Sequence, residues 1–202
     1  MLDRAAIALL KPMLDGMARG LVRAGIGADA ITLVGFGLGL GAAAAIAFGL
    51  PAPGLWLLLA SRLMDGLDGA VARQTAPTDR GAFLDITLDF LFYASIPLAF
   101  AIAEPAANAL AAAVLLAAFI GTGSSFLAFA VLAERRGIKS SDYPSKGLYY
   151  LGGLTEASET LLCFVLMCLW PQHFAAWAYG FAGLCALTIV TRLVGGWSAL
   201  RV

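Results

Sequence analysis

Long apolar stretches, separated by short polar or proline-containing segments, run through most of the chain. A helix needs about 20 mostly apolar residues to cross a membrane. Six stretches fit this length, and they cover residues 28–50, 54–73, 81–103, 108–133, 148–170 and 174–197. The pattern therefore predicts an all-α, polytopic membrane protein with six transmembrane helices, in a single domain of residues 1–202 whose bundle spans 28–197.

The segment before the first apolar stretch has a different pattern. In residues 1–25, apolar side chains such as Ile7, Leu10 and Leu14 recur at helical spacing, and charged ones such as Lys11 fall largely on another face. This pattern predicts an N-terminal amphipathic helix that lies in the membrane interface. An ordinary cytoplasmic helix packed against the rest of the protein is the alternative.

Composition agrees with a membrane protein and excludes other classes. Of the 202 residues, 61% are hydrophobic and 13% are charged, whereas soluble domains have about 25% charged residues. So few charges exclude a soluble enzyme and a disordered protein. The 13 basic residues balance the 13 acidic ones, so no net charge favours a nucleic acid as partner. The three cysteines, Cys163, Cys168 and Cys185, lie in apolar stretches without metal-binding spacing and are predicted to be packing residues.

Basic residues gather in the segments on one side of the predicted helices. Arg4, Arg19, Arg80 and Arg135 lie there, whereas the three connections on the opposite side contain no Lys or Arg. Positively charged loops stay in the cytoplasm. We therefore expect an integral protein of the bacterial inner membrane, with both termini and the active site facing the cytoplasm.

Four aspartates lie at the adjoining ends of the second and third predicted helices. Asp65 and Asp68 are three residues apart, and Asp85 and Asp89 are four apart, so each pair shares one face of its helix. The rise of about 1.5 Å per residue puts both pairs at a similar depth. Because the connection between these helices is short, we expect the two pairs to meet.

Four aspartates in one membrane region require bound cations, since each ionised one costs at least about 2.5 kcal/mol. Carboxylates without nearby His or Cys favour a hard ion, Mg²⁺ or Mn²⁺, and four can hold two such ions about 3.5–4 Å apart. Mg²⁺ usually keeps positions open for substrate phosphates. The pattern therefore predicts a pyrophosphate or phosphodiester substrate.

Small and phosphate-binding residues surround the aspartates. Gly69 and Gly81 would let a ligand approach the backbone, and Ala72 is small on the same face. Arg73 offers a planar guanidinium to phosphate oxygens, and Thr78 offers a hydroxyl. We expect these residues to bind the substrate. Helix packing or capping is the alternative for the two glycines.

These residues resemble the signature of the CDP-alcohol phosphatidyltransferase family. The chain has two aspartates three apart, a glycine after the second, Ala-Arg three residues further on, a seven-residue gap, a glycine and two more aspartates at four-residue steps. Every fixed position of the signature is filled. The resemblance implies transfer of a phosphatidyl group from CDP-diacylglycerol to a small alcohol in phospholipid biosynthesis, with release of CMP.

The resemblance also implies roles for the aspartates. Asp65, Asp68 and Asp85 are expected to be metal ligands. Asp89 is expected to be both a ligand and the general base that takes the proton from the attacking hydroxyl.

Further family positions match residues that hold the nucleotide diphosphate, namely Gly69, Arg73 and Thr78. Asp29 and Thr32 resemble a segment that lies beside the nucleotide, although the usual Pro-Asn form is absent. The resemblance also implies a homodimer.

The candidate residues for binding the acceptor alcohol lie in the second half of the chain. Lys146 and Arg192 are candidates for binding a phosphorylated acceptor, such as glycerol phosphate or inositol phosphate, and snorkelling is the alternative for each. Glu156 and Glu159 are predicted to share a face of the fifth helix. They would bind hydroxyls or an ammonium group, or pair with one of the two cations.

Two other functions use the same residues. A cation transporter would use the acidic cluster as its ion site, but it would need polar residues through the outer halves of the helices, which are nearly all apolar. A membrane hydrolase of a nucleotide-linked lipid would replace the alcohol with water.

Overall fold

The computed structural model describes residues 2–137 and 154–201, and every regular element among them is a helix. In chain order these are α1 (Leu2–Arg23), α2 (Ala28–Ala47), α3 (Pro51–Gln74), α4 (Asp79–Ala103), α5 (Pro105–Arg135), α6 (Ala157–Leu169), the short 3₁₀ helix η1 (Pro171–His173) and α7 (Phe174–Ala199). The all-α prediction is confirmed for this part of the chain.

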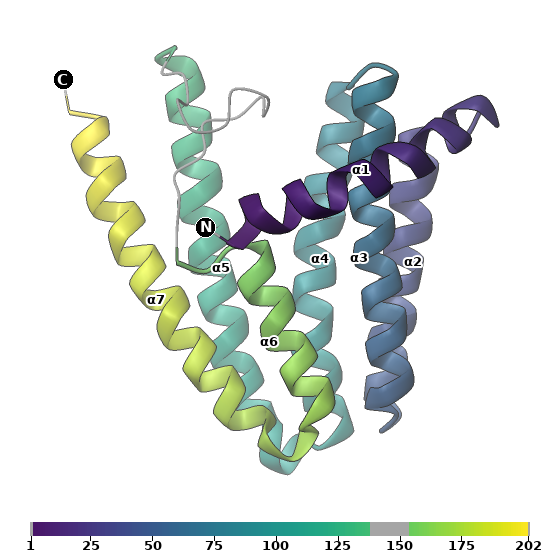
Figure 1. Ribbon diagram of the computed structural model, residues 1–202. Coiled ribbons are helices and arrows are strands. Elements are labelled where there is room, and N and C mark those ends of the chain that lie inside the picture. The colour runs from purple at the N-terminus through teal and green to yellow at the C-terminus, as the bar shows by residue number, and fades with distance from the viewer. Residues whose placement is uncertain (1, 138–153, 202) are drawn as a thin grey trace.

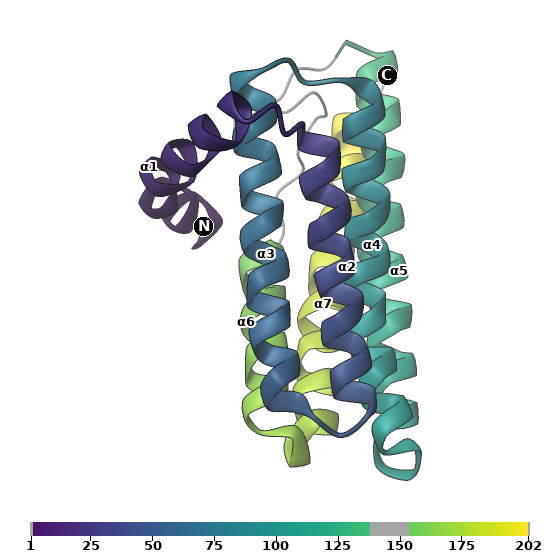
Figure 2. The ribbon, with the colours of Figure 1, turned by 90° about the vertical axis from the view of Figure 1, so that its right-hand side faces the viewer.

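The helices from α2 to α7 run side by side as a bundle, and α1 lies across it (Figures 1 and 2). In this bundle α2 packs against both α3 and α4, α4 packs against α5, and α5 packs against α7. The shorter α6 lies against α3 and α7. The position of α2 matters for function because it brings α3 and α4, which carry the aspartates, to one place.

Within residues 2–137 and 154–201, four helical segments are long and apolar enough to cross a membrane: α2, α4, α5 and the segment Pro171–Ala199. α3 has 24 residues, but its second half carries Arg62, Asp65, Asp68 and Arg73, which lower its hydropathy. α6 has only 13 residues, fewer than the about 20 that a span needs. Six spans therefore remain a prediction, supported by four apolar helices.

The predicted helix over residues 148–170 begins later than expected. Residues 148–153 lie outside the described residues, and Glu156 has an extended backbone and forms the N-cap of α6. Its side chain accepts from the backbone N–H of Glu159, and the Glu159 carboxylate accepts from the Glu156 N–H at 3.1 Å. This reciprocal capping box satisfies free N–H groups and starts a helix. The prediction that both glutamates share a helical face is therefore wrong.

Two apolar clusters hold the helices together. The larger contains Phe92, Ile96, Phe164 and Met167 and includes the three cysteines, which are free and buried, as expected of packing residues. The smaller joins α1 to α2 and α3. In it, a Cβ atom on Gly66 would lie 3.1 Å from Leu14 Cδ1, so α1 sits close to α3. Location of α1 in the membrane interface stays a prediction.

Candidate active site between α2, α3 and α4

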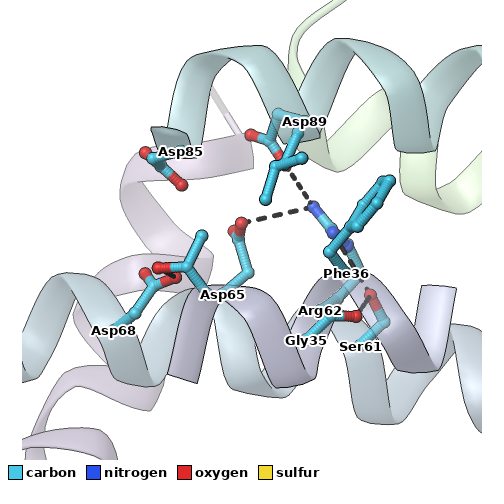
Figure 3. Close-up of a pocket in the computed structure, with 10 residues that line it drawn as sticks. Gly35, Phe36, Ser61, Arg62, Asp65, Asp68, Asp85 and Asp89 are labelled. Carbon is cyan, nitrogen blue, oxygen red and sulfur yellow. Dashed lines mark hydrogen bonds and ion pairs between the residues drawn. The ribbon is translucent and has the colours of Figure 1, made fainter. Parts of the chain in front are cut away.

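A small polar pocket lies between three helices that are separate in the sequence (Figure 3). α2 supplies Thr32, Gly35 and Phe36, α3 supplies Ser61, Arg62, Asp65 and Asp68, and α4 supplies Asp85, Leu88 and Asp89. All four predicted aspartates therefore line one pocket.

Three of the aspartates form a group with the spacing of a metal site. Asp65, Asp68 and Asp85 each offer one carboxylate oxygen, and these oxygens lie within 4.8 Å of one another. A donor set of carboxylate oxygens alone suits a hard divalent cation such as Mg²⁺ or Mn²⁺. The residues present therefore fit the predicted kind of metal.

The fourth aspartate has a cationic partner. Arg62 Nη1 donates to Asp89 Oδ1 at 2.8 Å, and the same nitrogen lies 3.4 Å from Asp65 Oδ1. Figure 3 shows the Arg62 guanidinium reaching between these two carboxylates. Asp89 thus belongs to the pocket but is held by an arginine, apart from the three-aspartate group.

Asp68 is the most buried of the cluster and is held by α2. It is only 6% exposed, and Thr32 Oγ1 donates to its Oδ2 at 2.6 Å. This hydrogen bond fixes one oxygen of a carboxylate that belongs to the predicted metal group. Thr32, which the family resemblance predicts to lie beside the nucleotide, is therefore in direct contact with a candidate metal ligand.

The start of α4 gathers three more predicted residues. Asp29 forms an ion pair with Arg80. Thr78 is the N-cap of α4, and its Oγ1 accepts from Gly81 N at 3.0 Å. A Cβ atom on Gly81 would lie 3.1 Å from both Asp29 Oδ1 and Thr78 Oγ1. Asp29, Thr78 and Gly81 are thus neighbours, and Gly81 has the capping contact that was its alternative explanation.

Gly69, Ala72 and Arg73 lie at the end of α3. Arg73 is exposed, and a Cβ atom on Gly69 would lie 3.3 Å from Arg73 Nη1. The arginine side chain therefore folds back over the glycine, one turn beyond Asp68. This is the arrangement expected if both residues face the same ligand.

Comparison with known proteins agrees with this geometry. The family model of CDP-alcohol phosphatidyltransferase matches residues 26–192, which include α2 to α6 and most of α7. The chain belongs to the CDP-alcohol phosphatidyltransferase family. The predicted enzyme class is thereby confirmed.

Two curated relatives differ in how much of the chain they match. Inner membrane protein YnjF of Escherichia coli (strain K12) is 51% identical over 201 residues, which cover 100% of this chain and 98% of the relative. Archaetidylinositol phosphate synthase of Methanothermobacter thermautotrophicus is 44% identical over 70 residues, 34% of this chain and 36% of that enzyme. The first relative and the apolar helices support an integral membrane protein.

Solved structures of phosphatidylinositol phosphate synthase (PgsA1) of Mycobacterium tuberculosis share the fold. The structure with CDP-DAG bound has a TM-score of 0.74 at 24% identity and covers 92% of this chain and 94% of that chain. The complex with manganese and citrate has a TM-score of 0.73 at 23% identity, with coverage of 91% and 88%. None of the proteins named above is described as a transporter.

Among the described residues, Glu156, Glu159 and Arg192, which were predicted to bind the acceptor, do not line the aspartate pocket. Arg192 is 8% exposed, and its Nη1 donates to Thr122 O at 3.0 Å, between α5 and α7. Glu156 and Glu159 cap α6. Lys146 lies outside the described residues. The acceptor role of all four therefore stays a prediction.

Arg62 is the main residue of this phosphatidyltransferase site that the sequence analysis missed. A signal was present, because a cation three residues before Asp65 in an apolar helix lies on the same helical face. Ser61, Gly35 and Phe36 also line the pocket. Their part in it depends on how α2 packs on α3, and no local pattern shows that.

Proposed function

We propose that this enzyme transfers a phosphatidyl group from CDP-diacylglycerol to a small polyol or polyol phosphate and releases CMP. The observation that carries the proposal is the group of Asp65, Asp68 and Asp85 oxygens within 4.8 Å, with Asp89 in the same pocket. Family membership supports the reaction class. The archaetidylinositol phosphate synthase relative and the PgsA1 structures support a phosphorylated polyol such as inositol phosphate as acceptor.

In this proposal Asp65, Asp68 and Asp85 bind Mg²⁺ or Mn²⁺, and Asp89 is the fourth ligand of a site for two such ions. Bound divalent cations would neutralise the lipid diphosphate and the charge that develops on the departing CMP. Asp68 contributes through an oxygen set by Thr32, since the 2.6 Å hydrogen bond fixes its rotamer. Such bonds to a metal ligand orient it and tune its affinity.

Asp89 acts as the general base. Its Oδ1 is held by Arg62, and its Oδ2 is the atom that we expect to take the proton from the acceptor hydroxyl. The acceptor oxygen then forms a bond to the lipid phosphorus as the bond to the CMP oxygen breaks, and CMP leaves with the bonding electron pair.

The nucleotide end of the substrate is assigned to residues beside the cluster. Arg73 would bind a diphosphate oxygen through its planar guanidinium, and Gly69 beneath it leaves room for the ligand. Asp29, Thr78 and Gly81, which are neighbours at the start of α4, would form the opposite wall. Ala72 is half-buried on the α3 side.

The remaining proposals concern the acceptor and the setting. Lys146, Glu156, Glu159 and Arg192 remain the residues proposed to recognise the acceptor. The enzyme is proposed to work as a homodimer, as the family resemblance implies. Its site and both termini are proposed to lie on the cytoplasmic side, because the distribution of basic residues favours that orientation.

The test is a product assay with purified protein. Labelled CDP-diacylglycerol is incubated with Mg²⁺, Mn²⁺ or EDTA and with single acceptors, namely glycerol phosphate, inositol phosphate, inositol or water alone. We expect CMP release with metal and one alcohol, and a matching lipid product by mass spectrometry. CMP release with phosphatidic acid as the product in water alone would replace the transferase with a hydrolase.

A further inference from the structure

The helix α1 crosses α3 near the end that carries Arg73 (Figure 1). A Cβ atom on Gly66 would lie 3.1 Å from Leu14 Cδ1. Further along α3, Gln74 Nε2 donates to Asp15 O at 3.0 Å. These two contacts lie at either end of the last turns of α3, so α1 is anchored beside the turn to which Arg73 belongs.

Three cationic side chains act on the carboxylate of Asp15 in α1. Lys11 Nζ donates to Asp15 Oδ2 at 2.6 Å, and this hydrogen bond is the main cause that holds the pKa of Asp15 below its usual value. The positive charges of Arg73 and Arg19 lower this pKa in the same direction. Two arginines from different helices therefore lie within electrostatic range of one carboxylate.

Both arginines fold back along their own helix toward the place where α1 and α3 cross. A Cβ atom on Gly16 would lie 3.7 Å from Arg19 Nη2, and one on Gly69 would lie 3.3 Å from Arg73 Nη1. Gly16 directly follows Asp15, and Gly69 lies one turn before Arg73. The two guanidinium groups thus approach the same crossing from two helices.

The Asp15 carboxylate does not neutralise the two arginines. It is paired with Lys11, and no carboxylate of the described residues lies within ion-pair distance of Arg19 or Arg73. Both arginines are exposed. Because planar guanidinium groups bind phosphate oxygens, two unpaired ones at one crossing suit a ligand with two phosphates.

We propose that Arg19 of α1 is a second phosphate-binding residue of the CDP-lipid site and binds the diphosphate beside Arg73. This inference rests on the part of the proposed function that assigns the diphosphate to Arg73. Lys11 supports the arrangement, because it keeps the Asp15 carboxylate from competing with the diphosphate. The phosphates of bilayer lipids also attract basic helices at a membrane surface, so the test has to separate these two sources of phosphate.

The experiment measures how purified protein in a neutral detergent binds CDP, which carries the diphosphate but no lipid. Equilibrium dialysis with Mg²⁺ present compares wild type with Arg19→Gln. We expect the variant to bind CDP at least about 10-fold more weakly, because hydrogen bonds to charged groups are strong. In the assay with CDP-diacylglycerol, KM should rise while kcat changes little, since the contact is made before and during the reaction.

Two variants of the same helix control for the loss of charge. Arg23→Gln removes an exposed arginine from the last turn of α1 and should bind CDP as wild type does. Arg19→Lys keeps the charge but loses the planar fork, so its CDP affinity should lie between those of wild type and Arg19→Gln.

A second pair of variants tests the arrangement without changing Arg19. Lys11→Gln leaves the Asp15 carboxylate without its partner, so that it competes for the two arginines and should weaken CDP binding by about 3-fold. Addition of Asp15→Asn removes the competing charge and should restore the wild-type affinity. Unchanged CDP binding in Lys11→Gln would show that Asp15 does not face the two arginines and would contradict the proposal.

Several results would overturn the role of Arg19. These are a CDP affinity in Arg19→Gln equal to that of wild type, and a fall in kcat without a rise in KM. A third is a rise in KM that occurs only in vesicles containing phosphatidylglycerol and not in neutral detergent, because it would assign Arg19 to the phosphates of the bilayer.

Arg73→Gln separates this inference from the proposed function. It should weaken CDP binding whether or not Arg19 takes part. If Arg73→Gln binds CDP as tightly as wild type, the proposed diphosphate site is itself wrong. If Arg73→Gln weakens CDP binding and Arg19→Gln does not, the proposed site stands and the role of Arg19 is overturned.

Discussion

Polar side chains have different partners in the two halves of the bundle. Around α2, α3 and α4, four carboxylates face one pocket, with one arginine against them (Figure 3). Around α5, α6 and α7, polar groups contact the backbone. Arg192 donates to Thr122 O, and Thr188 Oγ1 accepts from the backbone N–H groups of Leu154 and Thr155 at 3.2 and 3.1 Å.

This difference shows which half has unmet electrostatic needs. Buried polar groups that pair with backbone groups stabilise a fold without needing anything further. A group of carboxylates that outnumbers its cation has excess negative charge, which must be neutralised in a medium of low dielectric constant. The first half therefore needs a bound cation, whereas Arg192 and Thr188 of the second half already have backbone partners.

Replacement of the base should have the largest effect on activity. Asp89→Asn keeps the shape of the side chain but cannot take a proton, so we expect CMP release to fall by about 10²- to 10⁴-fold. Asp79→Asn, at an exposed position in the first turn of α4, is the matched control and should keep wild-type rates. Full activity in Asp89→Asn would show that Asp89 is not the general base. It would also weaken the distinction between a catalytic half and a half whose polar groups are paired with the backbone.

Loss of the hydroxyl that holds Asp68 comes next. Thr32→Val removes the 2.6 Å hydrogen bond without changing side-chain volume much. Because such bonds orient metal ligands, activity at limiting Mg²⁺ should fall about 10- to 100-fold and recover in part at high Mg²⁺. Thr87→Val is the control, because Thr87 is exposed and its hydroxyl donates to Phe83 O. Its activity at limiting Mg²⁺ should equal that of wild type. Equal behaviour of the two variants would contradict the role of Thr32.

A methyl group added to α2 tests the packing beneath the cluster. Gly39→Ala would place Cβ 2.6 Å from Phe92, whereas Gly37→Ala meets nothing within 4 Å. Overpacking of this kind costs about 1–3 kcal/mol, so the thermal unfolding temperature in detergent should fall for Gly39→Ala alone. A similar temperature for both variants would show that α2 does not pack as described.

The smallest effect is expected in the other half, at the start of α6. Glu159→Ala removes the carboxylate that accepts from Glu156 N, and a lost cap costs about 0.5–2 kcal/mol. Glu159→Gln can keep this acceptor and should unfold near the wild-type temperature. If Glu159 also binds the acceptor alcohol, both variants will raise its KM. An unchanged KM in both would leave capping as its role.

Sequence spacing predicted the functional half better than the supporting half. Asp65 and Asp68, three apart, and Asp85 and Asp89, four apart, had to face one way on each helix, and so their meeting followed from helix geometry. The position of Arg62 between them depends on Phe92 and Gly39, which come from two other helices. Such tertiary packing leaves no local pattern.

The start of α6 was missed for a different reason. Average hydropathy runs through residues 148–170 without a break, but the reciprocal pairing of Glu156 with Glu159 caps the N-terminus of α6, which begins at Ala157. Two acidic residues three positions apart are compatible both with a shared helical face and with an N-terminal capping box. The same spacing in α3 does form a shared face, so the backbone at the first residue of the pair decides between the two.

The central claim is that Asp65, Asp68 and Asp85 bind a divalent cation that engages the diphosphate of a CDP-lipid. It is tested most directly by CMP release from CDP-diacylglycerol, comparing wild type and Asp85→Asn over a Mg²⁺ and Mn²⁺ series. The account predicts that wild type is active with either metal and inactive in EDTA, and that Asp85→Asn loses at least about 10²-fold in rate. Undiminished CMP release by wild type in EDTA, or by Asp85→Asn, would contradict it.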